Sequence, residues 1–141
     1  MLGIRYAKIT DLEKLDELDR HVPWENMKKC ITDGRVIIAT YNGEIIGWLR
    51  FGYLYDIYPF LNMLFIREKF RNMRIGTRLM DQWEVDMLEK GNRFVYTSTQ
   101  EDENAQFFYR KRGYTDIGGF TPPGQDALEL VLYKDLGEAD G

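Results

Sequence analysis

Two β-rich runs joined by a tight turn constrain this fold more than any other feature of the sequence. Residues 35–41 and 44–53 are rich in β-branched and aromatic side chains, and Asn42-Gly43 lies between them. An Asn-Gly pair favours a type I′ turn, which closes a two-residue β-hairpin. Strands joined by such a turn are antiparallel, so a sheet that contains them cannot be all parallel.

Helical and strand patterns alternate along the rest of the chain. The capping-box pattern Thr10-Asp-Leu-Glu13 predicts the start of a helix that carries Leu12, Leu15 and Leu18. Further helices are expected over 24–31, 75–88 and 101–112, strands over 3–9, 60–66, 94–99, 114–117 and 128–133, and a loop with Gly118-Gly119 and Pro122-Pro123-Gly124 before the final strand. Residues 137–141 are expected to fray. The order β-α-α-β-β-β-α-β-α-β-β predicts an α/β protein with a mixed sheet.

Length and composition narrow the class of protein. The chain has 141 residues, 44% of them hydrophobic and 30% charged, which is typical of one globular domain spanning 1–141. One cysteine, Cys30, excludes an internal disulfide, and one histidine, His21, leaves little for a metal site or a Ser-His-Asp triad. We expect no metal. Without a signal-peptide or membrane-span pattern, we expect a cytoplasmic protein with no membrane partner.

Charge is unevenly distributed along the chain. The net charge is −4, which argues against a nucleic-acid partner, because such proteins need a basic field. Residues 67–78 nevertheless hold five basic side chains and one acid, Glu68, and so carry +4 against −8 elsewhere. Aromatic residues are also abundant, at 14% of the chain.

The basic segment coincides with the expected junction between the strand at 60–66 and the helix at 75–88. A helix N-terminus favours anions, yet Arg71, Arg74 and Arg78 surround this one, and the first acid is Asp81. A bound phosphate would explain the arrangement, and Gly76 would let the backbone approach it. The alternative is a solvated basic loop. The P-loop and Gly-x-Gly-x-x-Gly patterns are absent, which disfavours ATP hydrolysis and dinucleotide chemistry.

Two blocks of sequence resemble the GNAT superfamily of acetyl-coenzyme A-dependent N-acetyltransferases. Arg71-Asn-Met-Arg74-Ile-Gly76 is similar to that family's Arg/Gln-x-x-Gly-x-Gly/Ala, with Arg74 in place of the first glycine. The second block, from Ala105 to Tyr114, is similar to Ala-x-x-x-Tyr-x-x-x-Gly-Phe/Tyr. Together with the element order, the resemblance covers residues 3 to 134. It implies a mixed, mostly antiparallel sheet of about seven strands flanked by about four helices.

The resemblance also implies acetyl-CoA as co-substrate. Coenzyme A would lie in a splay between the strand ending at Ile66 and the strand at 94–99. The residues implied to bind it are Phe65, Ile66, Arg71, Asn72, Met73, Arg74, Ile75, Gly76, Thr77, Asn104 and Tyr109. Loop amides would hold the pyrophosphate, and the Ile66 amide would stabilise the oxyanion.

The resemblance assigns the general acid to Tyr109, which would protonate the coenzyme A thiolate after direct attack by a primary amine. Many relatives have a glutamate as base at the position of Asn62, and an amide cannot replace it. Asp56 is our best substitute, followed by Glu44 and solvent, or by a water chain ordered by Asn62.

The acceptor is expected to be a small-molecule or protein amine, attracted by the acidic remainder of the chain. Trp24, Trp48, Tyr53, Tyr55 and Tyr58 are candidates to line its site, although such aromatics more often fill a core. Two other hypotheses stay open: an acyl-CoA-binding regulatory module without turnover, and a nucleotide-binding protein. The resemblance also suggests a possible homodimer.

Overall fold

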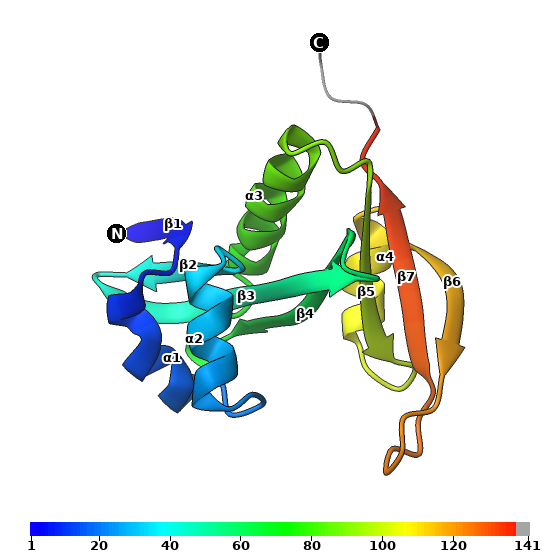
Figure 1. Cartoon of the computed structure of the whole chain (residues 1–141), viewed down its shortest axis with the longest axis horizontal. Coiled ribbons are helices and arrows are strands. Elements are labelled where there is room, and N and C mark those ends of the chain that lie inside the picture. The colour runs from blue at the N-terminus through cyan, green and yellow to red at the C-terminus, as the bar shows by residue number, and fades with distance from the viewer. Residues whose placement is uncertain (138–141) are drawn as a thin grey trace. The chain divides into compact units, whose positions relative to one another are not determined.

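The computed structural model describes residues 1–137, and the expected fraying of 138–141 lies outside them. The strands are β1 (Leu2–Tyr6), β2 (Val36–Tyr41), β3 (Glu44–Leu54), β4 (Tyr58–Ile66), β5 (Phe94–Gln100), β6 (Thr115–Phe120) and β7 (Glu129–Asp135). The α-helices are α1 (Leu12–Leu18), α2 (Trp24–Thr32), α3 (Ile75–Glu89) and α4 (Ala105–Lys111), with 3₁₀ turns at Ile9–Asp11 and Glu68–Phe70. This is the predicted order of elements (Figure 1).

The strands form one seven-stranded sheet in the order β1-β2-β3-β4-β5-β7-β6. β4 and β5 pair in parallel, through Phe60 with Tyr96 and Leu61 with Thr97. The pairs β1–β2, β2–β3, β5–β7 and β6–β7 are antiparallel. The prediction of an α/β protein with a mixed, mostly antiparallel sheet is therefore confirmed.

Hairpin turns follow from residues that tolerate a left-handed backbone. Asn42 and Gly43 have φ of 51° and 85°, the signs that a type I′ turn needs, so the predicted hairpin is confirmed. A second hairpin connects β3 to β4, where Tyr55 and Asp56 both have positive φ, 54° and 65°. There the chain places a tyrosine in a conformation that usually favours glycine or asparagine.

Three sequence predictions of local structure were wrong. The first cap is made by Asp11, which accepts a hydrogen bond from the Lys8 amide at 2.7 Å, and not by Thr10 with Glu13. Helix α4 begins at Ala105 instead of Glu101, because Gln100 and Glu103 close a turn first. Strand β6 runs through Gly118-Gly119, which we expected in a loop, and it absorbs them at a register shift.

The described residues form two compact units. The first comprises 1–52 and 63–83, and the second comprises 53–62 and the described residues from 84 onward. By sequence the first unit holds 13 basic and 10 acidic side chains, a net charge of +3. The described residues of the second unit hold six basic and 11 acidic side chains, a net charge of −5. The prediction of one domain spanning 1–141 stays a prediction.

The first unit has a core on each face of its strands. Helices α1 and α2 pack on one face through a cluster of buried side chains: Leu12, Leu15, Met27, Cys30, Ile31, Val36, Ile38, Ile45 and Trp48. On the other face Phe51 of β3 contacts Trp83 of α3, with ring centroids 5.7 Å apart. Burying a large apolar side chain contributes about 1.5–3 kcal/mol to the stability of the fold. These two cores therefore fix the positions of the end of β4 and the start of α3.

The second unit is held by a buried carboxylate. Glu84 of α3 accepts hydrogen bonds from the Tyr114 hydroxyl at 2.8 Å and from Lys134 at 2.7 Å. The Arg112 guanidinium lies 3.0 Å from the same side chain. Burial and the neighbouring Glu84 charge raise the pKa of Tyr114. The paired charges thus join α3, β7 and the start of β6.

Within the described residues, every helix is too short or too polar to span a membrane.

Candidate functional site

The basic segment connects β4 to α3, as predicted. Strand β4 ends at Ile66, a single 3₁₀ turn follows at Glu68–Phe70, and α3 begins at Ile75. The Arg78 amide donates to the Arg74 carbonyl at 3.1 Å, so this bond opens the helical ladder. The amides of the first helical turn have no partner within the helix and are directed at the preceding loop.

The loop itself has an unusual backbone. Asn72 and Arg74 have φ of 65° and 61°, in the left-handed region. An L-residue pays about 1–2 kcal/mol there, and arginine has no special tolerance of it. Alternation of left- and right-handed residues makes successive amides converge into an anion-binding concavity. Arg74 therefore adopts a strained backbone conformation in which a glycine would be unstrained.

Arg71 is turned back onto the end of β4. Its Nε donates to the Ile66 carbonyl at 2.9 Å, and its guanidinium lies 5.3 Å from the centre of the Phe65 ring. The Arg67 amide donates to Ile46 of β3 at 2.8 Å. Because successive residues of a strand direct their amides to opposite edges, the Ile66 amide is directed away from β3.

The remaining loop residues differ in exposure. Met73 is 58% exposed, whereas Ile75 is 2% exposed and contributes its side chain to the core. Gly76 and Thr77 are half-buried in the first turn of α3. Ile75 can therefore contact a ligand through its backbone but not through its side chain.

Gly47 of β3 is a positioning residue that the sequence did not reveal. A Cβ at this position would lie 2.7 Å from the Ile66 Cδ1 and 3.0 Å from the Phe65 carbonyl oxygen. The absence of a side chain therefore lets β4 approach β3 at the residues expected to bind coenzyme A. A glycine within an apolar strand is the signal that indicates such a close approach.

Tyr109 of α4 is buried in the second unit, at 6% exposure. Its ring contacts that of Tyr114, with centroids 5.7 Å apart. Burial raises the pKa of Tyr109 to about 12, a hydrogen bond with the Thr97 side chain opposes this, and the charge of Glu103 adds to it. The phenol is thus held in its protonated form at neutral pH.

Three further predicted site residues, Asn104, Asp56 and Asn62, also lie in the second unit. Asn104 precedes α4, and its carbonyl accepts from the Phe107 amide at 3.0 Å. Asp56 is exposed in the hairpin turn between β3 and β4, and Asn62 is exposed on β4. Their geometry assigns none of the three a chemical role.

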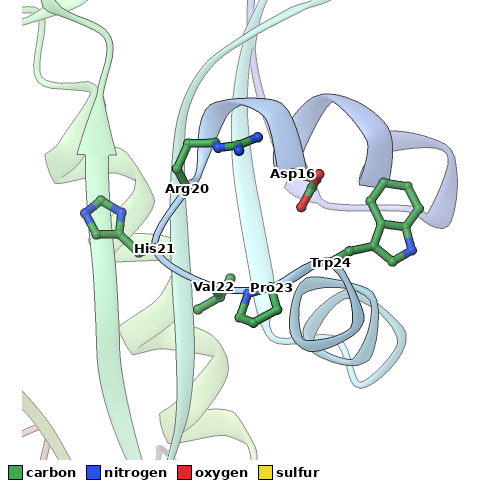
Figure 2. Close-up of a pocket in the computed structure, with 6 residues that line it drawn as sticks. All are labelled: Asp16, Arg20, His21, Val22, Pro23 and Trp24. Atoms are coloured by element: carbon green, nitrogen blue, oxygen red, sulfur yellow. The ribbon is translucent and has the colours of Figure 1, made fainter.

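A cavity of about 490 Å³ lies between α1 and α2 in the first unit. It is lined by Asp16, Arg20, His21, Val22, Pro23 and Trp24, and Figure 2 shows the His21 and Trp24 side chains on opposite sides of the view, with Val22 and Pro23 between them. Trp24, one of the aromatic residues predicted to line the acceptor site, therefore does line a cavity. Trp48, another, belongs to the core.

Beside this cavity lies a buried charge network that the sequence did not predict. Asp19 is fully buried, and its Oδ2 accepts from Arg50 Nε at 3.0 Å and from Trp48 Nε1 at 3.1 Å. Its Oδ1 lies 3.2 Å from Nδ1 of His21. Burial raises the pKa of Asp19, but Arg50 and the hydrogen bonds outweigh it, so the pKa lies below its usual value. The cavity wall is therefore anchored to β3.

A smaller cavity of about 360 Å³, also in the first unit, contains Glu44, our second candidate for the base. It lies beside Thr10, Asp11, Lys14, Gly43, Ile45 and Arg67. Lys14 and Arg67 bring positive charge to this carboxylate's surroundings.

Comparisons with known proteins agree with this architecture. Ard1 from Thermoplasma volcanium is 18% identical with a TM-score of 0.82, over 97% of this chain and 99% of that chain. The ribosomal-protein-S18-alanine N-acetyltransferase from Escherichia coli is 13% identical with a TM-score of 0.78, over 99% and 97%. An aminoglycoside 6′-N-acetyltransferase complexed with coenzyme A is 18% identical with a TM-score of 0.79, over 99% of each chain. No curated protein matches the chain.

Sequence comparison identifies the family. Residues 6–114 match the sequence model of the acetyltransferase (GNAT) family, which spans most of the chain and includes both resembling blocks. At these identities the structural neighbours establish the fold, and the family match goes further. The chain belongs to the GNAT family of acetyltransferases.

Proposed function

We propose that this protein is an N-acetyltransferase that moves the acetyl group of acetyl-CoA to a primary amine. The observation that carries the proposal is the loop before α3, where Asn72 and Arg74 adopt left-handed conformations beside a helix N-terminus. Family membership and the coenzyme A complex of one structural neighbour support it.

The charge and the backbone conformation of the loop support the proposal that it binds a pyrophosphate. The amides of residues 72–77 would hold it, with Arg71, Arg74 and Arg78 supplying positive charge. Asn104 is proposed to bind another part of coenzyme A. When bound, acetyl-CoA supplies the activated acyl group as a thioester.

Backbone groups at the end of β4 are proposed to align the reaction. The Ile66 amide, directed away from β3, would donate to the oxygen on which negative charge develops. Main-chain groups of Phe65 and Ile66 would pair with the pantetheine arm. Arg71 already occupies one lone pair of the Ile66 carbonyl, so we propose that it steadies this strand end.

Tyr109 is proposed as the general acid. Its Oη keeps its proton at neutral pH, with a pKa raised to about 12. Because such a phenol is a weaker acid than a thiol with a pKa of about 8.5, its role is chiefly to stabilise the leaving thiolate by donating a hydrogen bond, with the proton passing to sulfur as the C–S bond breaks. Tyr109→Phe should lower turnover far more than it raises the Kd for acetyl-CoA, measured by thiol release and by calorimetry. Unchanged turnover in Tyr109→Phe would contradict the assignment.

For the base we propose the Asp56 carboxylate, with a water chain ordered by Asn62 as the second route. Asp56→Asn should then shift the pH profile of turnover to higher pH. Asn62→Asp, which restores a carboxylate on β4, should raise the rate at neutral pH if the second route operates. An unchanged profile in both variants would leave deprotonation to solvent.

One feature favours a second candidate, an acyl-CoA-binding module without turnover: Asn62 stands where many relatives have a glutamate. Both candidates predict thermal stabilisation by acetyl-CoA. Release of free thiol with an amine panel, together with a product 42 Da heavier than the amine, would exclude the module. The homodimer and the cytoplasmic location stay predictions.

The loop has a direct test. Arg74→Glu should weaken acetyl-CoA binding at least tenfold, because a charge-assisted hydrogen bond contributes about 1.5–3 kcal/mol. Lys28→Glu, an equal charge change on the exposed side of α2, is the matched control and should leave binding unchanged. Equal effects of both variants would mean that net charge, and not this loop, determines affinity.

A further inference from the structure

Aromatic side chains form a continuous row in the second unit. Tyr58, Tyr96, Tyr133 and Phe94 follow one another with ring centroids 5.7, 6.3 and 6.1 Å apart. We call these four residues the aromatic row. Tyr58 is 39% exposed, and the other three are half-buried.

The pairing of the strands places the row on one face of the sheet. Tyr96 pairs with Tyr133 and with Phe60, and Tyr58 lies two residues before Phe60, so all of them share a face. Thr97 is directed to the opposite face, where α4 packs on β5. Figure 1 shows α4 behind β5 and β7. The row is therefore on the face that α4 leaves uncovered.

The row has the chemistry of a cation site. Aromatic faces attract cations electrostatically. One cation already lies at its end, since the Arg93 guanidinium is 5.3 Å from the centre of the Phe94 ring. Burial, and then the neighbouring Tyr58 and Tyr133, raise the pKa of Tyr96. Its hydroxyl therefore stays neutral and can accept a hydrogen bond from an ammonium group.

The charge around the row selects a cationic ligand over a second copy of the chain. Residues 53–62 and 84–137 of the second unit carry 11 acidic and six basic side chains. On the face of the row, Glu129 and Asp135 alternate with Tyr133 along β7, and Arg93 is paired with Asp135 at 2.9 Å. Two copies docked through this face would bring like net charges together, whereas an ammonium ligand gains from them.

We propose that the aromatic row binds a linear aliphatic oligoamine, with ammonium groups over successive rings and methylenes along the ring faces. Three of the rings, Tyr58, Tyr96 and Tyr133, lie on the successive strands β4, β5 and β7, which suits an extended chain better than a compact ligand, and Phe94 returns to β5 beside Tyr133. Identifying this ligand as the acetyl acceptor rests on the proposed function, but its binding to the row does not.

The test is calorimetric titration of the whole protein with bis(3-aminopropyl)amine, a linear triamine, without acetyl-CoA. Tyr58→Leu and Tyr96→Leu should each weaken binding about two- to fivefold, the effect of one exposed cation–π contact. Tyr96→Phe, which keeps the ring, should retain most of the affinity. Phe107→Leu is the matched control, because this exposed aromatic lies on α4, and it should bind like the parent.

Butylamine should bind at least tenfold more weakly than the triamine. Equal affinity for the two amines, unchanged binding in both leucine variants, or binding of an amine-terminated peptide in place of the triamine would overturn the inference. Circular dichroism checks folding, and Tyr58→Leu, at the exposed start of β4, serves where Tyr96→Leu does not fold. Thiol release with other amines, but no triamine binding, would overturn this inference and leave the proposed function intact.

Discussion

Asp19→Asn should be one of the most destabilising single-atom changes in the protein. The variant keeps the shape of the side chain but removes the negative charge that faces Arg50, which is itself only 6% exposed. The Asn amide also cannot accept at both of its polar atoms: if its oxygen keeps Trp48 and Arg50, its NH₂ group faces the His21 backbone amide, which then loses its acceptor. Breaking a buried ion pair in this way costs about 3–5 kcal/mol.

Asp33→Asn is the matched control for this prediction. Asp33 also faces two cations, Lys29 at 3.1 Å and Arg35 at 3.4 Å, but it is exposed. Solvent screens such pairs, so the same substitution there should have little effect on stability. Urea denaturation at pH 7 measures both variants.

The pH dependence adds a second check. The folded-state pKa of Asp19 lies below its usual value, so its stabilising contribution is complete above the unfolded value of about 4. It is lost as the pH falls through the folded value. The stability gap between the parent and Asp19→Asn should therefore be full at pH 7 and should narrow below about pH 4. A loss no larger than that of Asp33→Asn, or a gap independent of pH, would refute the reasoning.

Three further substitutions have defined outcomes in denaturation experiments. Gly47→Ala should cost about 1–3 kcal/mol, because the new Cβ would overlap the end of β4; a neutral result would show that the strand can move aside. Trp83→Phe should stay within about 1 kcal/mol of the parent, since the buried Nε1 has no hydrogen-bond partner among the described residues, whereas Trp83→Ala should cost about 3–5 kcal/mol. Arg74→Gly should stabilise by about 0.5–1 kcal/mol through relief of a left-handed backbone, and a loss of stability would mean that the side chain holds the loop.

The order of elements could be predicted from the sequence because the signals were local. The Asn42-Gly43 turn, the period of the strands and the arginines before α3 each act within a few residues. The errors arose where a tertiary partner decided the outcome. Asp11 caps the first turn with help from Arg5, 2.8 Å away, and Gly118 enters a strand because β7 pairs with it.

For the candidate site, the sequence indicated residues whose roles stay predictions. The loop was found through its violation of helix-dipole chemistry, and Tyr109 through its resemblance to a family block. Neither method could find Asp19, whose partners Trp48 and Arg50 lie about thirty residues away in sequence. The aromatic row depends on strand register, and in the described part of the chain no short turn connects β4 to β5 or β5 to β7 to set that register from the sequence.

The division of charge between the two units has a kinetic consequence. The first unit carries a net +3 and the second a net −5 over the described residues, so the fields around them have opposite sign. Under the proposed function, the net charge of the first unit attracts an anionic acyl donor, and that of the second attracts a cationic acceptor. Added salt should slow both association rates, each according to the charge of its own target.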